Sequence, residues 1–206
     1  MAIDTDLKIC ALAMSWLGSD APTDLETPVS TPDIVCAANY EASRDAVLED
    51  GEFSFAIGRD KLDSPTEVEG EPNKFDLGDA SATILRLLQV GAKYDFTDNT
   101  QWVKEGNFVR VELDEVYIRY IAQITDVTLM TPSVIQAIAA HIAAVTAVTM
   151  TNSAKVEERR WAIYGTKLAT AMANDGRVGK SRQLTSDALI NARYSAGGSG
   201  YMGPYV

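Results

Sequence analysis

The sequence is poor in histidine, since it contains a single one. His141 lies in the most apolar stretch of the chain, with no cysteine or carboxylate within one helical turn. General-base chemistry, Cys–His pairs and histidine-rich metal sites all need such a group beside the histidine. We therefore predict that His141 is a core or interface residue, that the protein holds no metal or cofactor, and that it is not an enzyme.

Cysteine is almost as scarce, since only Cys10 and Cys36 are present. Two cysteines in 206 residues are no disulfide framework, so both are predicted to be buried thiols in a reducing compartment. A secretory signal is also missing from the start of the chain, because Asp4, Asp6 and Lys8 interrupt it before any apolar run. We expect the protein to be made in the cytoplasm.

The sequence lacks an apolar run that predicts a membrane span. The longest run, residues 133–150, is rich in Ala, Thr and Val, has no Leu or Phe, and contains Gln136 and His141. A membrane-spanning helix needs about 20 strongly apolar residues. The run is therefore predicted to be a buried helix. Because it is apolar nearly all round, it needs either three neighbours within its own chain or a subunit interface, and both remain open.

Two short patterns match catalytic or phosphate-binding motifs only in part. Residues 176–181, Gly-Arg-Val-Gly-Lys-Ser, end like a phosphate-binding loop, but Asn174 stands where that motif needs a glycine, and a predicted helix precedes it. Glu112 and Glu115 could form the carboxylate pair of a glycosidase, yet nothing in the sequence separates their pKa values. Neither pattern predicts catalysis.

Acidic residues outnumber basic ones by 29 to 18, and their distribution is uneven. Residues 1–80 hold 18 acidic and 5 basic residues, whereas residues 155–206 hold 4 acidic and 8 basic residues. The N-terminal part would repel a polyanion, and the C-terminal part would attract an acidic partner. Tyr117, Arg119 and Tyr120 come closest to a nucleic-acid platform, and a strand of a small sheet explains them better.

The first helix is predicted over about residues 5–18. Apolar side chains between Ile9 and Leu17 recur at helical spacing. Gly18 stands where a residue in the left-handed conformation would end the helix.

A second helix is predicted over about residues 32–50, after a loop that contains proline. Thr31 suits the N-cap, Pro32 suits the first turn, and Asp33 is favoured at the positive end of the helix dipole. We expect this helix to face the first one.

The middle of the chain is predicted to be rich in β-strands. Residues 64–78 are expected to form a loop and an edge strand, and residues 83–90, 107–113 and 116–125 to form further strands. Residues 53–62 are expected to add another helical turn or two. We predict one small antiparallel sheet inserted between two helical pairs.

Helical spacing returns over about residues 133–150 and 153–175. The predicted fold class is α+β: mainly an antiparallel helical bundle, with a small antiparallel β-sheet insertion and an extended C-terminal arm. The predicted segments are an N-terminal helical pair over 1–63, a β-rich insertion over 64–131, a C-terminal helical pair over 132–176, and a basic, Gly-rich docking arm over 177–206.

The predicted arm combines basic residues with a glycine-rich end. Four glycines among residues 195–203 oppose ordering of the free segment, but aromatic residues at its tip would anchor it in a partner's groove. The predicted docking residues are Arg177, Lys180, Arg182, Arg193, Tyr194, Tyr201, Met202, Tyr205 and Val206.

The two N-terminal helices and the segment after them carry a recognisable set of residues. The set is Trp16-Leu17-Gly18, Cys36, Tyr40, Arg44-Asp45-Ala46-Val47-Leu48 and Phe53-Ser54-Phe55-Ala56. With weaker matches at 85–90 and 120–126, it resembles the head-to-tail adaptor family of short-tailed bacteriophages, also called tail tubular protein A. The likeness spans most of the chain. It implies that the frame of the helical bundle is formed by Trp16, Leu17, Gly18, Tyr40, Arg44 and Leu48.

The resemblance implies a structural virion protein of the phage tail, assembled in the host cytoplasm. Such a subunit forms a homo-oligomeric ring of twelve copies that joins the portal protein to the tail nozzle protein and continues the DNA channel used in DNA ejection. The helices would form the ring wall, the sheet would meet the nozzle or a tail fibre or spike, and the arm would dock on the portal. An acidic lumen would let DNA pass without specific binding.

Three alternatives remain open. One is a head-completion or connector protein of a longer-tailed phage, which also combines helices with a docking tail, although the inserted sheet argues against it. A second is a tail-associated cell-wall hydrolase, which the missing acid and base residues disfavour. The third is a soluble helical binding module of unrelated origin.

Overall fold

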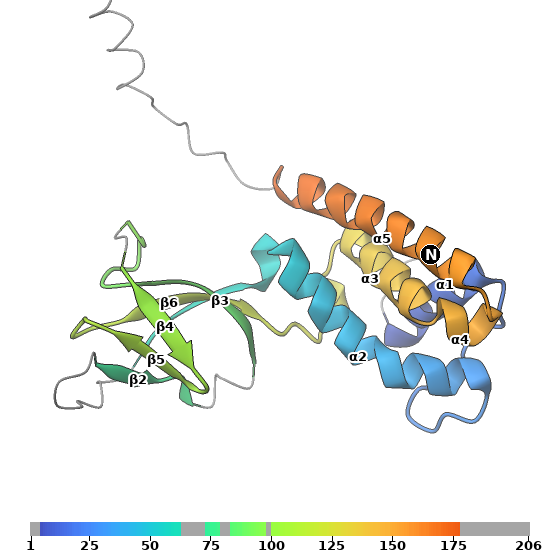
Figure 1. Ribbon diagram of the computed structural model, residues 1–206, viewed down its shortest axis with the longest axis horizontal. Coiled ribbons are helices and arrows are strands. Elements are labelled where there is room, and N and C mark those ends of the chain that lie inside the picture. The colour runs from blue at the N-terminus through green and yellow to red at the C-terminus, as the bar shows by residue number, and fades with distance from the viewer. Residues whose placement is uncertain (1–4, 63–72, 79–82, 98–99, 178–206) are drawn as a thin grey trace, which may run out of the picture.

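The computed structural model describes residues 5–62, 73–78, 83–97 and 100–177. Helices gather at one end of an elongated molecule and strands at the other (Figure 1). In chain order the elements are α1 (Asp6–Leu17), α2 (Thr31–Gly51), η1 (Ser54–Ala56), β1 (Ile57–Lys61), β2 (Lys74–Asp76), β3 (Ile84–Gly91), β4 (Trp102–Glu105), β5 (Phe108–Val111), β6 (Tyr117–Ala122), η3 (Val127–Leu129), α3 (Pro132–Val145), α4 (Ala147–Thr151) and α5 (Ala154–Asp175).

Helix α1 ends as its sequence predicts. Gly18 has a φ of 73°, in the left-handed region. Its N–H donates to the Ser15 carbonyl at 3.3 Å, and the Ser19 N–H donates to the Met14 carbonyl at 3.1 Å. These bonds satisfy carbonyl groups that the end of the helix would otherwise leave unpaired, so the chain turns here without a steric penalty.

Helix α2 begins one residue earlier than predicted, because Ser30, not Thr31, is its N-cap. The Ser30 hydroxyl accepts from the Asp33 N–H at 3.3 Å, while the Asp33 carboxylate accepts from the Ser30 N–H at 2.9 Å. Asp33 also accepts from the Thr23 N–H at 2.7 Å. This reciprocal capping box holds the preceding loop against the start of the helix.

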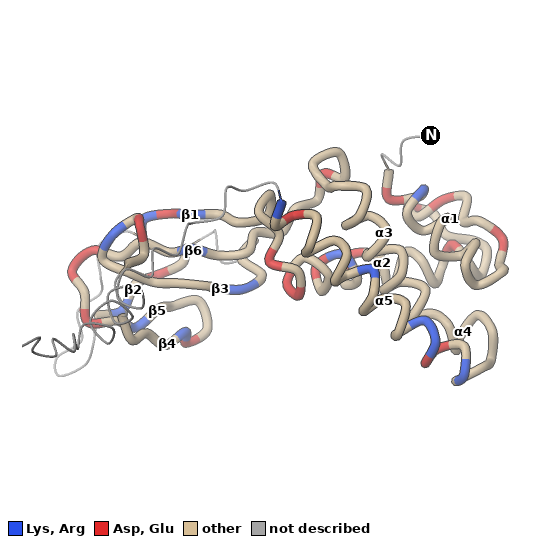
Figure 2. The backbone as a smooth tube through the Cα atoms, turned by 90° about the horizontal axis from the view of Figure 1, so that it is seen from above, with Lys and Arg blue, Asp and Glu red and all other residues tan. Residues whose placement is uncertain are grey.

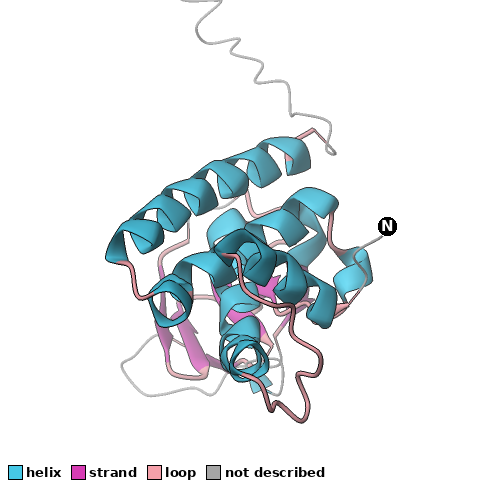
Figure 3. Cartoon of the chain, turned by 90° about the vertical axis from the view of Figure 1, so that its right-hand side faces the viewer, coloured by secondary structure: helices cyan, strands magenta, loops and turns pink. Residues whose placement is uncertain are grey.

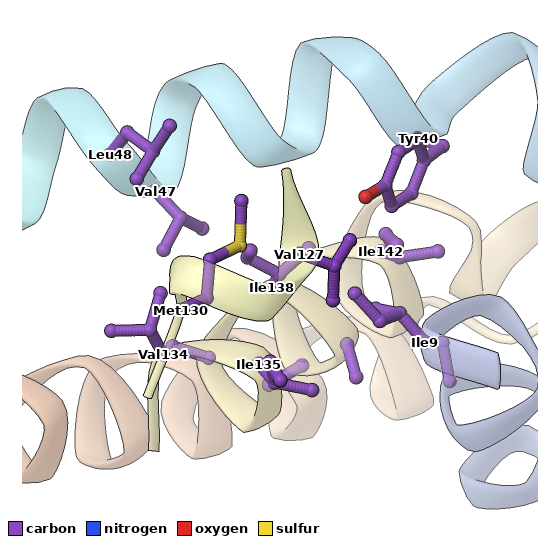
Figure 4. Close-up of a cluster of buried hydrophobic side chains, with 14 of the residues drawn as sticks. Ile9, Tyr40, Val47, Leu48, Val127, Met130, Val134, Ile135, Ile138 and Ile142 are labelled. Atoms are coloured by element: carbon purple, nitrogen blue, oxygen red, sulfur yellow. The ribbon is translucent and has the colours of Figure 1, made fainter. Parts of the chain in front are cut away.

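Helix α3 lies at the centre of the helical part. Helices α1, α2 and α5 all pack against it, and nine of its fourteen residues are buried. Figure 4 shows this core, in which Ile138 and Ile142 of α3 lie near Val47 of α2 and Ile9 of α1. The predicted contact between the first two helices is present but small, because α1 and α2 pack mainly on α3. Its own chain supplies the three neighbours that this apolar helix needs.

The long helix predicted over 133–150 is interrupted at Thr146. Its hydroxyl donates to the Ile142 carbonyl at 2.7 Å, and the chain continues as the short helix α4. A threonine that bonds back to the preceding turn bends a helix. Helix α5 then runs back along α3 on the outside of the molecule (Figure 3).

The strands form two three-stranded antiparallel sheets rather than the single sheet predicted. One has the order β1-β6-β3 and the other β2-β5-β4. Residues 57–61, expected as helical turn, are strand β1, which pairs with β6. Only η1 before it is helical. Strand β1 therefore belongs with the sheets, although it lies inside the helical segment predicted over 1–63.

The two sheets pack against each other around a second apolar core. Phe75, Val109 and Val111 reach it from the β2-β5-β4 sheet, and Val90 and Ile118 from the β1-β6-β3 sheet. All five are nearly or fully buried. Two sheets as small as these are stable because each buries its apolar side chains against the other.

The described residues thus form a mixed fold of five α-helices and two small antiparallel sheets. The finer prediction of an antiparallel helical bundle stays a prediction. None of the helices within the described ranges is long and apolar enough to cross a membrane.

Candidate functional site

The predicted frame residues at the end of α1 connect that helix to α5. Trp16 and Leu17 pack at the margin of the helical core. The Arg160 guanidinium donates a hydrogen bond to the Trp16 carbonyl, and the Lys167 ammonium lies 6.0 Å from the centroid of the Trp16 ring. Together with the cap at Gly18, these contacts fix how α1 meets α5.

The frame residues on α2 lie on its buried side. Tyr40 and Arg44 are each only 4% exposed, and Leu48 is fully buried. The Tyr40 hydroxyl donates to the Asp6 carboxylate at 2.8 Å, which links α2 to the start of α1. Burial, with this hydrogen bond, raises the pKa of Tyr40 well above its usual value, so its hydroxyl remains a donor.

The buried charge of Arg44 is neutralised within the chain. Its Nε donates to Asp45 Oδ1 at 2.8 Å, and Asp45 Oδ2 accepts from Gln123 Nε2 at 2.6 Å. Gln123 directly follows β6, so this network connects α2 to the sheet part. Because a buried guanidinium without a partner would be costly, Arg44 serves the fold.

A polar and aromatic layer, not predicted from the sequence, joins α2, α3 and α5. The Tyr164 hydroxyl donates to Asp50 Oδ2 at 2.8 Å. The His141 ring centroid lies 4.9 Å from that of Tyr164 and 5.3 Å from that of Trp161, in edge-to-face geometry. Burial lowers the pKa of His141. The prediction of a core or interface histidine fits this half-buried position.

The two cysteines lie inside the helical core. Cys10 and Cys36 are both fully buried and unbridged. The hydrogen bond to Cys36, followed by burial, raises the pKa of the Cys10 thiol far above its usual value. A neutral thiol without solvent access is a poor nucleophile and metal ligand. This position fits the predicted role as buried thiols.

The outer side of α5 is open. Of its 22 residues only Tyr164 and Ala171 are buried, and several others are half-buried. Its outer face forms a shallow groove lined by Ala162, Gly165, Thr166, Ala169, Thr170, Ala173, Asn174 and Arg177. A Cβ added at Gly165 would meet nothing within 4 Å. Small residues let the backbone of another helix approach closely.

Of the predicted docking arm, Arg177 alone falls within the described part of the chain. It is exposed, just after the C-terminal end of α5. The other predicted arm residues lie outside the described residues: Lys180, Arg182, Arg193, Tyr194, Tyr201, Met202, Tyr205 and Val206.

The outer face of the β1-β6-β3 sheet carries a second group of residues that the sequence did not reveal. Arg59 on β1 lies directly opposite Arg119 on β6, and Arg119 lies opposite Gln89 on β3. The Tyr94 and Tyr117 rings meet edge to face at 6.1 Å beside them. We call these five residues the arginine face.

The structure separates the three residues considered as a nucleic-acid platform. Tyr117 and Arg119 belong to the arginine face, whereas Tyr120 packs on the core between the sheets. Its ring crosses β1 at Gly58, where an added Cβ would lie only 2.5 Å from it. Alternation of side chains along β6 causes this separation.

Within the described ranges, no group of three or more His, Cys, Asp or Glu side chains is placed to hold a metal ion. Glu115, one of the two carboxylates considered for a glycosidase, instead pairs with the Lys61 ammonium at 3.0 Å. No protein-family model matches the chain, and comparison with curated proteins finds no match.

Proposed function

We propose that this protein is a non-enzymatic, ring-forming subunit of a bacteriophage tail. The ring joins the portal protein to the tail nozzle protein and continues the DNA channel. The helices, arranged as an antiparallel bundle, build the ring wall. The sheet part faces the nozzle or a tail fibre or spike, and residues 177–206 dock on the portal.

The observation that carries this proposal is the open outer side of α5. Helix α5 packs on α3 along one side only, so its opposite side, with small exposed residues, is free to contact another subunit. Its groove of small residues suits the close approach of a helix from a neighbouring copy. A surface of one subunit that binds a different surface of the next generates a ring when the rotation closes.

The distribution of charge along the sequence supports the roles proposed for the N-terminal and C-terminal parts of the chain. The basic residues 177–193 directly follow α5, so they would leave the ring wall at one edge. Twelve such arms, each making a modest contact, would bind a portal tightly because they act together. The acidic N-terminal part gives the ring a surface that repels passing DNA rather than binding it.

Two variants of α5 test the role of its groove. Ala169 lies in the groove and is exposed in the isolated chain, so Ala169→Glu should leave folding unchanged but block ring formation on portals. Ala154→Glu is the matched control, because Ala154 is exposed on the same helix outside the groove. Sedimentation with purified portal measures both. If both variants assemble equally well on portals, the groove on α5 is not the contact between neighbouring subunits.

The connector of a longer-tailed phage is the second candidate. It shares the docking tail and the helices, and the two-sheet part argues against it. Binding of the nozzle protein to portal-attached chain, with and without the sheet part, distinguishes the two candidates, since only the adaptor needs that part to receive the nozzle.

A further inference from the structure

Two arginines occupy directly opposed positions on neighbouring strands of the β1-β6-β3 sheet. Arg59 and Arg119 are register partners of the antiparallel pair β1 and β6, so their side chains project from the same face. Basic positions on these adjacent strands are visible in Figure 2. Like charges placed directly opposite each other destabilise a sheet. Their pairing here therefore calls for a compensating anion.

The described residues supply no carboxylate to either arginine. Arg119 Nη1 donates to the neutral Gln89 Oε1 at 3.0 Å, and its buried Nε has no hydrogen-bond partner within that part of the chain. The Arg59 guanidinium lies over the Tyr94 ring, 5.5 Å from its centroid. By contrast, Arg86 on β3 pairs with a glutamate of its own chain.

The surroundings of the pair are those of a protein-binding surface. Tyr94 is 56% exposed, and its ring meets Tyr117 edge to face. Tyrosine and arginine are enriched where proteins bind each other, because they combine apolar area with polar groups. The exposed Arg59 guanidinium and the exposed Tyr94 ring can therefore contact one ligand together.

We propose that the arginine face binds a carboxylate on an acidic segment of a protein partner. Arg59 and Arg119 project from the same face of neighbouring strands, so one carboxylate lying over that face can accept charge-assisted hydrogen bonds from both guanidiniums. An apolar side chain next to that carboxylate would pack on Tyr94. This site lies on the sheets and does not depend on whether the chain forms a ring.

A protein carboxylate is favoured over a nucleic acid by the charge of the surroundings. The chain carries a net charge of −11, and Glu115 lies beside the face through its pair with Lys61. A polyanion would meet this negative field along its length, and nucleic-acid binding needs many cations that follow the backbone. To bind a single carboxylate, the face needs only Arg59 and Arg119.

The test uses a fluorescein-labelled peptide with a single Glu beside Leu, with the same peptide carrying Gln for Glu as its control. Anisotropy titrations of the full chain should show binding of the acidic peptide only, weaker at higher salt. Arg59→Gln and Arg119→Gln should each weaken binding about tenfold, the value of one charge-assisted contact. Lys104→Gln, an exposed charge loss on β4, should leave binding unchanged.

Urea unfolding of the same variants checks the pairing independently. Because each substitution removes like-charge repulsion, Arg59→Gln should be as stable as the unaltered chain or more stable. A loss of stability in Arg59→Gln larger than that in Tyr94→Leu, which removes the same contact between the guanidinium and the ring, would show that Arg59 pairs with an anion of its own chain, which overturns the proposal.

Three binding results would also overturn it. The first is equal binding by all variants. The second is tighter, arginine-dependent binding of oligothymidylate, which would assign the face to nucleic acid. The third involves residues 63–72, which carry four acidic residues and lie outside the described ranges. If the peptide binds only after those four are changed to Gln and Asn, the face is occupied by its own chain.

Discussion

Replacing Ile138 by alanine tests the central position of α3. Ile138 is fully buried in the helical core, among side chains of α2 and of the segment before α3 (Figure 4). The substitution removes three carbon atoms, worth about 2.4 kcal/mol of lost burial at about 0.8 kcal/mol per methylene. The cavity left between packed helices adds to this, so the free energy of unfolding should fall by about 3–4 kcal/mol.

Urea unfolding followed by far-UV circular dichroism measures this loss, with an unchanged dependence on urea concentration showing that the unfolding reaction is the same. Ile34→Ala is the matched control, because Ile34 lies on α2 and is 52% exposed. It should change stability by less than about 0.5 kcal/mol. Losses within 1 kcal/mol of each other, by this estimate, would refute the placement of α3 at the centre of three helices.

Further predictions concern pH and helix ends. His141 has a lowered pKa when folded, so the unfolded chain binds its proton first and stability should fall as pH drops through about 6.5. Urea unfolding should therefore show the unaltered chain losing stability relative to His141→Phe between neutral and mildly acidic pH. Hydrogen bonds from Ser30 and Thr23 lower the pKa of Asp33, so its stabilising effect is present above about pH 4 and is lost below it. Asp33→Asn should accordingly destabilise at neutral pH and less near pH 2, because the effect is lost progressively as pH falls from about 4 towards the lowered pKa. Gly18→Ala should cost about 1 kcal/mol in unfolding experiments, because alanine is strained at a φ of 73°.

Each of these predictions has a defined contrary result. A pH-independent stability difference between His141→Phe and the unaltered chain would show that His141 does not titrate differently on folding. Equal effects of Asp33→Asn at both pH values would mean that its carboxylate charge is not what caps α2. Gly165→Ala, in open space on α5, should stabilise by about 0.5–1 kcal/mol. If Gly165→Ala instead lowers stability as much as Gly18→Ala does, the left-handed backbone at Gly18 does not explain the stability lost in Gly18→Ala.

Local sequence signals predicted the ends of helices well. Gly18 ends α1 because glycine readily adopts the left-handed conformation. The N-cap of α2 is Ser30, one residue before the predicted Thr31. The break at Thr146 was missed, because a threonine bonds back only when the surrounding packing favours the bend.

The pairing of strands that lie far apart in the chain could not be predicted from the sequence. Strand β1 has five residues and pairs with β6, about sixty residues further along the chain. Because this strand is short and mixes polar with apolar residues, sequence patterns alone predict that the preceding helical structure continues through it. The same pairing brings Arg59 opposite Arg119, so the arginine face exists only once this register is known. By contrast, Leu48, named from the resemblance as a frame residue, is fully buried.

The mass of the purified protein, measured by sedimentation alone and with a phage portal protein, tests the proposed ring most directly. The proposal predicts a chain of 22.3 kDa that assembles as twelve copies on each portal, because many weak contacts act together once the ring is seated. Deletion of residues 194–206 should abolish this attachment while the circular dichroism of the chain is retained. A protein that keeps its monomer mass beside the portal, or that degrades peptidoglycan as a monomer, would contradict it.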